Sequence, residues 1–318
     1  MEHYVTLFNS LFLPQGLALY QSMVKKVQDF NLWILCVDEE TYSTLDQKRL
    51  PFLKLLKLSD WETPELLEVK KDRSIGEYCW TLTPFAPRFV FSADPSIKRV
   101  TYLDADLWFL QDPSPIFNEF NRSLKKILIT EHAYAPEYDK SATCGKYCVQ
   151  FIIFDRLGSE YVRDWWEKKC LEWCYDRIEE GKFGDQKYLD DWSFQFTETV
   201  HILQHKEWIQ APWNAIRFPY SDAIIWHFQG LRIEKNRIRW FQDYTIPKVT
   251  LKHIYQPYIN ELLTIIKQLN FRQIQGEPES SLILLLRRIR FLFRKIMTIK
   301  DVVIYSEKKT TLVNLDSF

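Results

Sequence analysis

The chain has 318 residues, and its 42 basic and 42 acidic side chains give a formal net charge of zero. This length fits one large domain or two ordinary ones, and the balanced charge argues against a nucleic-acid partner bound over the whole surface. Hydrophobic residues make up 46% of the sequence, with only 8 Gly and 14 Pro, which excludes a disordered or collagenous chain. Aromatic residues are unusually frequent at 16%, and their rings either fill a core or stack on sugars and bases.

The start of the chain has no basic segment and no cleavage site of small residues, so no signal peptide is expected. No uncharged apolar run approaches the ~20 residues of a membrane span. We therefore expect a cytoplasmic protein, at most bound to the inner face of the cytoplasmic membrane, whose six cysteines are thiols. The four-residue spacing of Cys144/Cys148 and of Cys170/Cys174 leaves structural zinc as the less favoured alternative, because the usual zinc hairpin is tighter and Cys170 and Cys174 fall within a predicted helix.

Short apolar runs alternate with helical patterns along most of the chain. The expected strands are 4–8, 32–37, 53–58, 99–103, 127–130, 147–154, 200–203 and 223–228. The expected helices are 16–30, 39–49, 77–91, 160–180 and one that begins at 185. Pro84 and Pro87 should bend or split the helix 77–91. Strands separated by helices predict an α/β fold, in which a mostly parallel central sheet is flanked by helices on both faces.

The sequence changes character near its end. Residues 275–281 form a polar stretch with Gly and Pro, so we expect a domain at 1–274 and a tail at 275–318. Residues 282–300 contain six basic and no acidic side chains, with the apolar side chains on one helical face and most basic ones opposite. This pattern predicts a basic amphipathic helix, which would lie on an anionic membrane or dock on the domain with its basic face in solvent.

Two carboxylates follow directly after a predicted strand in Tyr-Leu-Asp-Ala-Asp, at Asp104 and Asp106. Open α/β sheets bind ligands at the carboxyl ends of their strands. Two carboxylates one residue apart can converge on a hard divalent cation, whose other positions suit the oxygens of a nucleotide diphosphate. The alternative is an ordinary polar turn.

A histidine, His227, ends the last predicted strand of the domain. If its imidazole joined the two carboxylates, the site would favour Mn²⁺ over Mg²⁺. Gly230 would let the backbone approach a phosphate closely, and Arg232 could neutralise that phosphate. The alternative for the histidine is a plain surface or core position.

A third motif, Gly-Asp-Gln-Lys-Tyr-Leu-Asp-Asp-Trp, opens the predicted helix after residue 184. Asp185 either caps this helix or, together with Gln186, hydrogen-bonds sugar hydroxyls. Trp192 offers a ring face to a sugar, and so does Trp213 in the rigid turn Ala-Pro-Trp-Asn, where Asn214 is a further candidate for substrate contact.

In this order the motifs resemble the bacterial GT-A-fold glycosyltransferases, a family similar to glycogenin and the lipopolysaccharide galactosyltransferases. The resemblance covers residues 1 to about 235 and includes Gly-Glu-Tyr-Cys-Trp-Thr at 76–81 and His-Phe-Gln-Gly-Leu-Arg at 227–232. It implies a Rossmann-like fold and a retaining transfer of a hexose from a nucleotide diphosphate sugar, with a UDP-sugar favoured. The implied acceptor is a hydroxyl of a glycan or glycolipid, in cell-surface polysaccharide synthesis.

The resemblance also implies roles for single residues. Asp104, Asp106 and His227 would bind the metal, and Gly230 and Arg232 would contact the diphosphate. The base and ribose would be contacted by Thr6, Leu7 and Phe8. The donor sugar and the reacting carbon would be contacted by Asp185 and Gln186.

The chain departs from the family pattern at a few positions. Cys148 and Gln150 stand where the family usually has Asn and Gly, and Ile233 stands where it has Lys. An inverting enzyme would need a carboxylate base, for which Asp190 and Asp191 are candidates.

Two other functions stay open. One is a non-catalytic nucleotide-sugar-binding protein on a degenerate transferase fold. The other is a sugar nucleotidyltransferase, which is disfavoured because it needs a Gly-rich phosphate loop and residues 9–16 contain one Gly.

Overall fold

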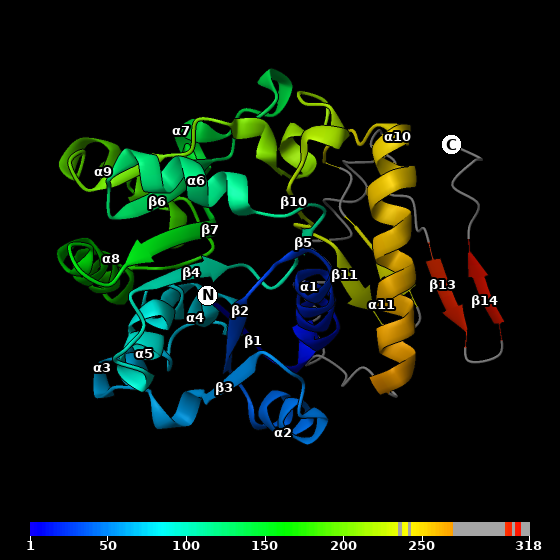
Figure 1. Ribbon diagram of the computed structural model, residues 1–318, viewed down its shortest axis with the longest axis horizontal. Coiled ribbons are helices and arrows are strands. Elements are labelled where there is room, and N and C mark those ends of the chain that lie inside the picture. Colours follow the sequence, from blue (N-terminus) through cyan, green and yellow to red (C-terminus); the bar gives the residue numbers. More distant parts are fainter. Residues whose placement is uncertain (235–236, 241–242, 270–302, 307–308, 313–318) are drawn as a thin grey trace. The chain divides into compact units, whose positions relative to one another are not determined.

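The computed structural model describes residues 1–234, 237–240, 243–269, 303–306 and 309–312. The chain divides into two compact units, Met1–His227 and Phe228–Phe318, which we describe separately (Figure 1). The predicted boundary at 274 and the predicted amphipathic helix at 282–300 lie outside the described residues.

A seven-stranded sheet forms the centre of the first unit, in the order β3-β2-β1-β4-β7-β6-β8. Its strands are β1 (Glu2–Phe8), β2 (Phe30–Cys36), β3 (Leu53–Lys57), β4 (Arg99–Leu103), β6 (Ile127–Glu131), β7 (Tyr147–Asp155) and β8 (Val200–Ile202). Strand β7 runs antiparallel to both of its neighbours, β4 and β6, and all the other pairs are parallel. The predicted α/β class with a mostly parallel sheet is therefore confirmed.

The first unit also contains a smaller, three-stranded sheet. In it β5 (Leu107–Phe109) pairs antiparallel with β10 (Ile225–His227), which pairs in parallel with β9 (Ile209–Gln210). Because β5 follows β4 after only three residues, this small sheet joins the end of the unit to the carboxyl end of β4.

The helices of the first unit cover both faces of the main sheet (Figure 1). They are α1 (Leu13–Lys26), α2 (Glu39–Lys48), α3 (Pro64–Val69), α4 (Ile75–Leu82), α5 (Phe85–Ala93), α6 (Ser114–Ser123), α7 (Ser141–Cys144), α8 (Glu160–Glu172) and α9 (Leu189–Gln195). Val5 of β1 belongs to the core shared with α3, α4, α5, α8 and α9. Its neighbour Tyr4 points the other way, with edge contacts to Phe109 of β5 and Phe117 of α6. With both faces buried, the ends of the strands are where the sheet can expose a site.

Two helix predictions need comment. The expected split at the prolines is observed, because α4 ends at Leu82 and α5 begins at Phe85. The expected helix 160–180 is wrong at its end, since α8 stops at Glu172. The backbone of Trp173 is extended. Its indole nitrogen donates to Glu179, and the guanidinium of Arg177 lies over its ring, so these side-chain contacts take the place of the last two predicted helical turns.

The second unit contains β11 (Arg232–Glu234), β12 (Arg237–Arg239), β13 (Val303–Ser306) and β14 (Lys309–Leu312), joined in an antiparallel sheet. Its helices are α10 (Lys248–Thr250), a π-helical turn (Leu251–Tyr255) and α11 (Gln256–Leu269). Phe228 stacks on Tyr258 with ring centroids 3.6 Å apart, and Tyr255 meets its edge.

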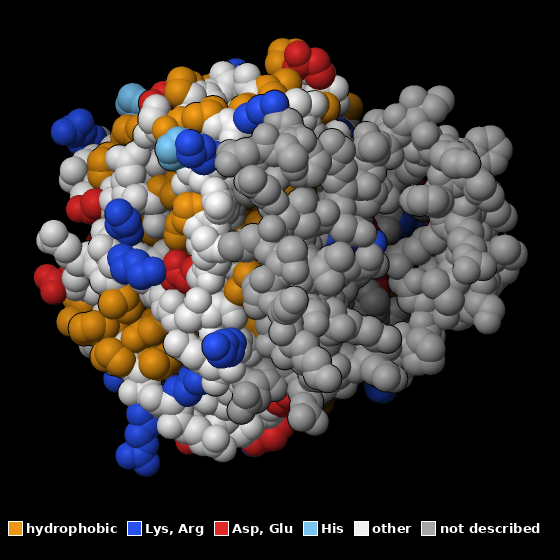
Figure 2. All heavy atoms as spheres, turned by 90° about the vertical axis from the view of Figure 1, so that its right-hand side faces the viewer, with side chains coloured by type: hydrophobic (Ala, Val, Ile, Leu, Met, Phe, Trp, Pro, Cys, Tyr) orange, Lys and Arg blue, Asp and Glu red, His pale blue; other side chains and the backbone are white. Residues whose placement is uncertain are grey.

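None of the described helices is long and apolar enough to cross a membrane. On the described part of the face in Figure 2, basic side chains stand singly or in small groups among apolar and acidic ones. This mixture is what the zero net charge leads us to expect.

Candidate active site

Asp104 and Asp106 lie at the carboxyl end of the central strand β4. The amide of Asp104 donates to the carbonyl of Gln150 in the neighbouring strand β7, at 3.0 Å. Strand β5 then starts at Leu107, which pairs directly with His227 of β10. The register of the small sheet therefore brings the imidazole beside the two carboxylates.

The three side chains converge on one point. The Nε2 atom of His227 lies 3.0 Å from Oδ1 of Asp106 and 3.7 Å from Oδ2 of Asp104. One ligand atom from each residue lies within 4.8 Å of the others. Ligands at right angles around an octahedral ion with bonds of about 2.1 Å are about 3 Å apart. Two carboxylates and one imidazole nitrogen at these distances fit one divalent cation.

The electrostatics of the pair also fit a cation. Burial is the largest cause that raises the pKa of Asp104 to about 6; the effects of His227 and Tyr102 oppose this rise, and the charge of Asp106 adds to it. The Tyr102 hydroxyl donates to Oδ1 of Asp104 at 3.1 Å. A bound divalent ion would favour the ionised form of both carboxylates and so oppose this rise.

The other side of the His227 ring is also fixed. Its Nδ1 atom lies 2.8 Å from Oε1 of Gln150, a residue for which no role was predicted. No local pattern could have revealed this contact, because it joins two strands of different sheets. Trp213 meets the imidazole edge-on, with ring centroids 5.4 Å apart.

The turn that carries Trp213 is held by its own side chains. The indole Nε1 of Trp213 donates to the carbonyl of His132 at 2.7 Å, and the amide of Asn214 donates to the same carbonyl at 3.0 Å. Asn214 also accepts from the amide of Ala211. Both predicted sugar-contacting side chains are buried, and their described polar contacts brace this turn against His132.

Trp192 is fully buried, at 0% exposed. Its ring packs against Trp166 and Phe154, at centroid distances of 5.4 and 6.3 Å. In this structure the ring has no exposed face for the sugar contact that the sequence suggested, and it serves the core of the first unit.

Asp185 is a buried carboxyl group, 3% exposed, that makes no capping hydrogen bond. Its Oδ2 atom has no hydrogen-bond partner among the described residues. Burial raises the pKa of Asp185 to about 8, and the charge of Asp104 acts in the same direction. Gly184, with φ of +53°, lets the chain pass close to the Trp80 ring. The geometry thus departs from simple helix capping.

Gln186, the other predicted sugar contact, is partly exposed and belongs to a 3-10 turn that leads into α9. Its Nε2 atom donates to the carbonyl of Cys144 at 2.8 Å. The orientation of its amide therefore depends on the short segment that contains α7.

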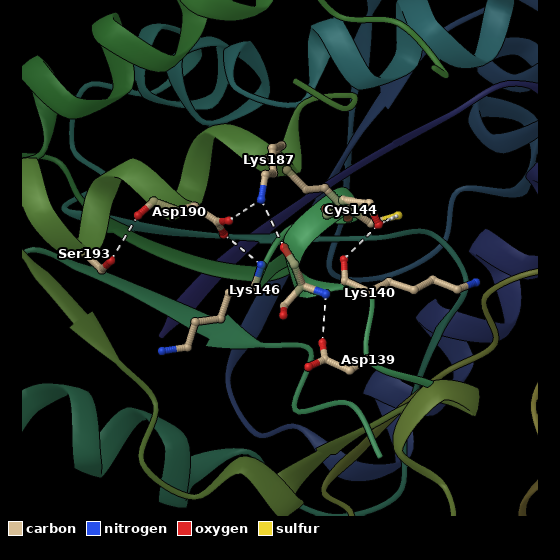
Figure 3. Close-up of polar contacts among 10 residues, drawn as sticks. Asp139, Lys140, Cys144, Lys146, Lys187, Asp190 and Ser193 are labelled. Atoms are coloured by element: carbon tan, nitrogen blue, oxygen red, sulfur yellow. Dashed lines mark hydrogen bonds and ion pairs between the residues drawn. The ribbon is translucent and has the colours of Figure 1, made fainter. Parts of the chain in front are cut away.

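Lys187 and Asp190 hold that segment (Figure 3). Lys187 donates to the carbonyl of Ser141 and to Oδ2 of Asp190, at 3.0 and 2.8 Å. Oδ1 of Asp190 accepts from the amide of Lys146 at 2.8 Å. Both oxygens of Asp190 are therefore engaged in structural contacts.

The first strand places Thr6, Leu7 and Phe8 next to each other at its buried carboxyl end. The Thr6 hydroxyl has no hydrogen-bond partner in the part of the chain that the structure describes. The Phe8 ring lies 2.3 Å from where a Cβ of residue 16 would be, so Gly16 is required for this approach.

Gly230 and Arg232 belong to the second unit. Gly230 has φ of +80°, a conformation that favours glycine. Arg232 begins β11 and donates to the carbonyl of Leu231 at 2.9 Å.

The six cysteines are free thiols, and four of them are buried. Burial raises the pKa of Cys148, the residue that stands in β7 two positions before Gln150.

Comparison with known sequences gives the family. No family model matches the chain. The uncharacterized protein YfnF of Bacillus subtilis (strain 168) is 33% identical over 286 residues, which are 84% of this chain and 93% of YfnF. The chain belongs to the family of YfnF. A second protein of the same strain, the uncharacterized YfnD, is 29% identical over 282 residues, covering 82% of this chain and 88% of YfnD.

Comparison with solved structures gives the fold. The galactosyltransferase LgtC, in complex with donor and acceptor sugar analogs, matches with a TM-score of 0.53 at 11% identity, over 87% of this chain and 98% of LgtC. The glycosyltransferase GlyE of Streptococcus pneumoniae TIGR4 matches with a TM-score of 0.50 at 15% identity, over 84% of this chain and 63% of GlyE. The GT-A-type fold that the motifs predicted is therefore confirmed.

Proposed function

We propose that this protein is a metal-dependent glycosyltransferase. It moves a hexose from a nucleotide diphosphate sugar, preferentially a UDP-sugar, to a hydroxyl group of a glycan or glycolipid. The observation that carries the proposal is the convergence of Asp104, Asp106 and His227 at the carboxyl end of β4, the edge where a GT-A-type sheet binds its ligands.

Asp104, Asp106 and His227 would hold the cation, and two oxygens with one imidazole nitrogen favour Mn²⁺ over Mg²⁺. When bound, the cation supplies neutralisation of the charge that develops on the departing nucleotide diphosphate.

The remaining chemistry falls to Asp185 and Gln186. The buried carboxyl of Asp185, with one oxygen that no described residue satisfies, hydrogen-bonds a hydroxyl of the donor sugar. Gln186, whose amide nitrogen is held by Cys144, directs its side-chain oxygen toward the positive charge that develops at the anomeric carbon.

We propose that the reaction retains the anomeric configuration. The bond from the anomeric carbon to the diphosphate oxygen breaks, and a bond to the acceptor oxygen forms on the same face of the ring. The proton of the acceptor hydroxyl passes to the departing phosphate oxygen, so no separate base is needed. The engagement of both Asp190 oxygens supports this route over one in which Asp190 is the base.

We further propose that the enzyme works in the cytoplasm at the inner face of the membrane, in polysaccharide synthesis. The support is the sequence of residues 282–300, which combines an apolar face with six basic side chains.

The test uses the full chain with a panel of nucleotide sugars and acceptors, with Mn²⁺ or with EDTA. Wild-type protein should release the nucleotide diphosphate only with the metal. Asp106→Ala should lower turnover by about 10²–10³-fold, the scale of lost charge stabilisation in a transition state. The control is Asp46→Ala, an exposed acid on α2, which should keep full activity.

Two results would overturn the proposal. Full activity of Asp106→Ala in EDTA would remove the metal from the mechanism, and binding of a nucleotide sugar without turnover across the panel would favour a non-catalytic binding protein. NMR of the product's anomeric proton distinguishes retention from inversion.

A further inference from the structure

Gln150 touches both halves of the candidate metal site. It lies in the middle of β7 and is 1% exposed. Its carbonyl accepts the amide of Asp104 at 3.0 Å, and its side-chain Oε1 lies 2.8 Å from Nδ1 of His227. One residue therefore links the end of β4 to the end of β10.

A buried amide in a strand is unfavourable unless it is hydrogen-bonded. Here the contact with His227 accounts for the side-chain oxygen. The hydrogen bond to the imidazole therefore explains how a polar side chain is accommodated at this buried position.

The hydrogen bond selects one tautomer of His227. An amide oxygen only accepts, so the proton in this contact belongs to Nδ1. A neutral imidazole with its proton on Nδ1 presents a lone pair at Nε2, the atom that faces Asp104 and Asp106. Without Gln150, the two carboxylates would favour a proton on Nε2, and in that tautomer the atom facing them has no lone pair for a cation.

We propose that Gln150 is a positioning residue that holds His227 in the orientation and tautomer that bind a divalent cation. Its carbonyl fixes the amide of Asp104 at the same time, so that ligands from two sheets keep one geometry. This role of Gln150 concerns cation binding alone. It rests on the proposed function only in that the bound cation would serve sugar transfer.

The main experiment measures Mn²⁺ affinity of the full chain without any sugar, by the electron paramagnetic resonance signal of free Mn²⁺. Gln150→Met keeps the length of the side chain and removes the acceptor. It should weaken Mn²⁺ binding by about 10–100-fold, the usual effect of losing such a partner. Gln150→Glu keeps an acceptor for Nδ1 and should restore the affinity to within about threefold of wild type.

The matched control is Gln210→Met. Gln210 is also a fully buried glutamine, in β9, but its amide donates to the carbonyls of Glu207 and Pro219. This variant should lower thermal stability with no change in Mn²⁺ affinity. Equal losses of affinity in the Gln150→Met and Gln210→Met variants would mean a general packing effect and overturn the proposal.

A second readout needs no metal. Long-range ¹H–¹⁵N NMR at about pH 9, where histidine is normally neutral, reports which ring nitrogen carries the proton. His227 should be protonated on Nδ1 in wild type and in Gln150→Glu, and on Nε2 in Gln150→Met. The same tautomer in all three proteins would overturn the proposal.

The two proposals fail separately. If Gln150→Met changes the tautomer and the Mn²⁺ affinity while wild type transfers no sugar, the positioning role stands and the proposed function falls. If wild type shows metal-dependent transfer and Gln150→Met binds Mn²⁺ as wild type does, the reverse holds.

Discussion

At the scale of single residues, Asp185 is the acid whose pKa most affects the stability of the fold. Its pKa rises from 3.8 to about 8 because the side chain is buried and faces the charge of Asp104. Between these values the unfolded chain loses the proton that the folded chain keeps. The free energy of unfolding therefore falls as the pH rises through this range, by up to about 1.4 kcal/mol per pH unit.

We expect Asp185→Asn to remove this pH dependence. Urea unfolding in EDTA should show the variant more stable than wild type at about pH 7.5, with a smaller difference at about pH 5. Sugar transfer by the variant should be lost, because the amide cannot replace the carboxyl group toward the donor. Parallel stability curves, or full transfer activity, would contradict the assignment.

The candidate metal ligands show which part of a site can be predicted. Asp104 and Asp106 follow an apolar strand, so the parallel-sheet rule alone puts them at the correct edge. The contact of His227 with Gln150 depends on the register between β5 and β10, which no local pattern contains. The burial of Trp192 could not be predicted for the same reason, since the ring's partners Trp166 and Phe154 are distant in sequence.

At the scale of elements, the segment from Asp139 to Lys146 is the structure that orients Gln186. It contains the short helix α7, and besides the bond to Gln186 it contacts the pair Lys187 and Asp190 (Figure 3). The pair is partly exposed, so it contributes little to the free energy of unfolding and serves mainly to hold the segment in position.

We expect Asp190→Ala to lower the kcat of sugar transfer by about tenfold, because the segment that holds the Gln186 amide loses its bond at Lys146, and Lys187, which contacts Ser141, loses its ion-pair partner. Asp190→Asn keeps an acceptor for the amide of Lys146 and should lose less. Mn²⁺ affinity should stay unchanged in both, because the metal ligands lie on other elements. The control Gln195→Ala alters an exposed side chain on the same helix. A kcat loss of more than about 10³-fold in both Asp190 variants would instead indicate a catalytic base.

The ends of helices could be predicted only where a local residue determines them. Pro84 gave the break between α4 and α5, because proline acts on the local backbone. The end of α8 at Glu172 was missed, because Trp173 leaves the helix to meet Glu179 and Arg177 in a turn that helical periodicity cannot describe.

At the scale of the whole molecule, the high aromatic content first reflects packing. Three tryptophans, Trp166, Trp192 and Trp226, are almost completely buried in the first unit. Alternating strands and helices were enough to predict the α/β class, because burial on both faces of a parallel sheet imposes that pattern. The antiparallel direction of β7 was not predictable, since apolar runs look alike in either direction.

The metal ion and the nucleotide diphosphate of the proposed function should stabilise the folded protein cooperatively. A nucleotide diphosphate offers oxygens to the same cation that Asp104, Asp106 and His227 would bind, so each ligand should raise the affinity for the other. UDP with Mn²⁺ should therefore raise the melting temperature of the full chain by more than the sum of the separate shifts. At 100 times the Kd the gain is about 2.7 kcal/mol, or roughly 4 °C for a protein of this size. Asp106→Ala should abolish the excess, whereas additive shifts in wild type would mean that metal and nucleotide bind at separate sites.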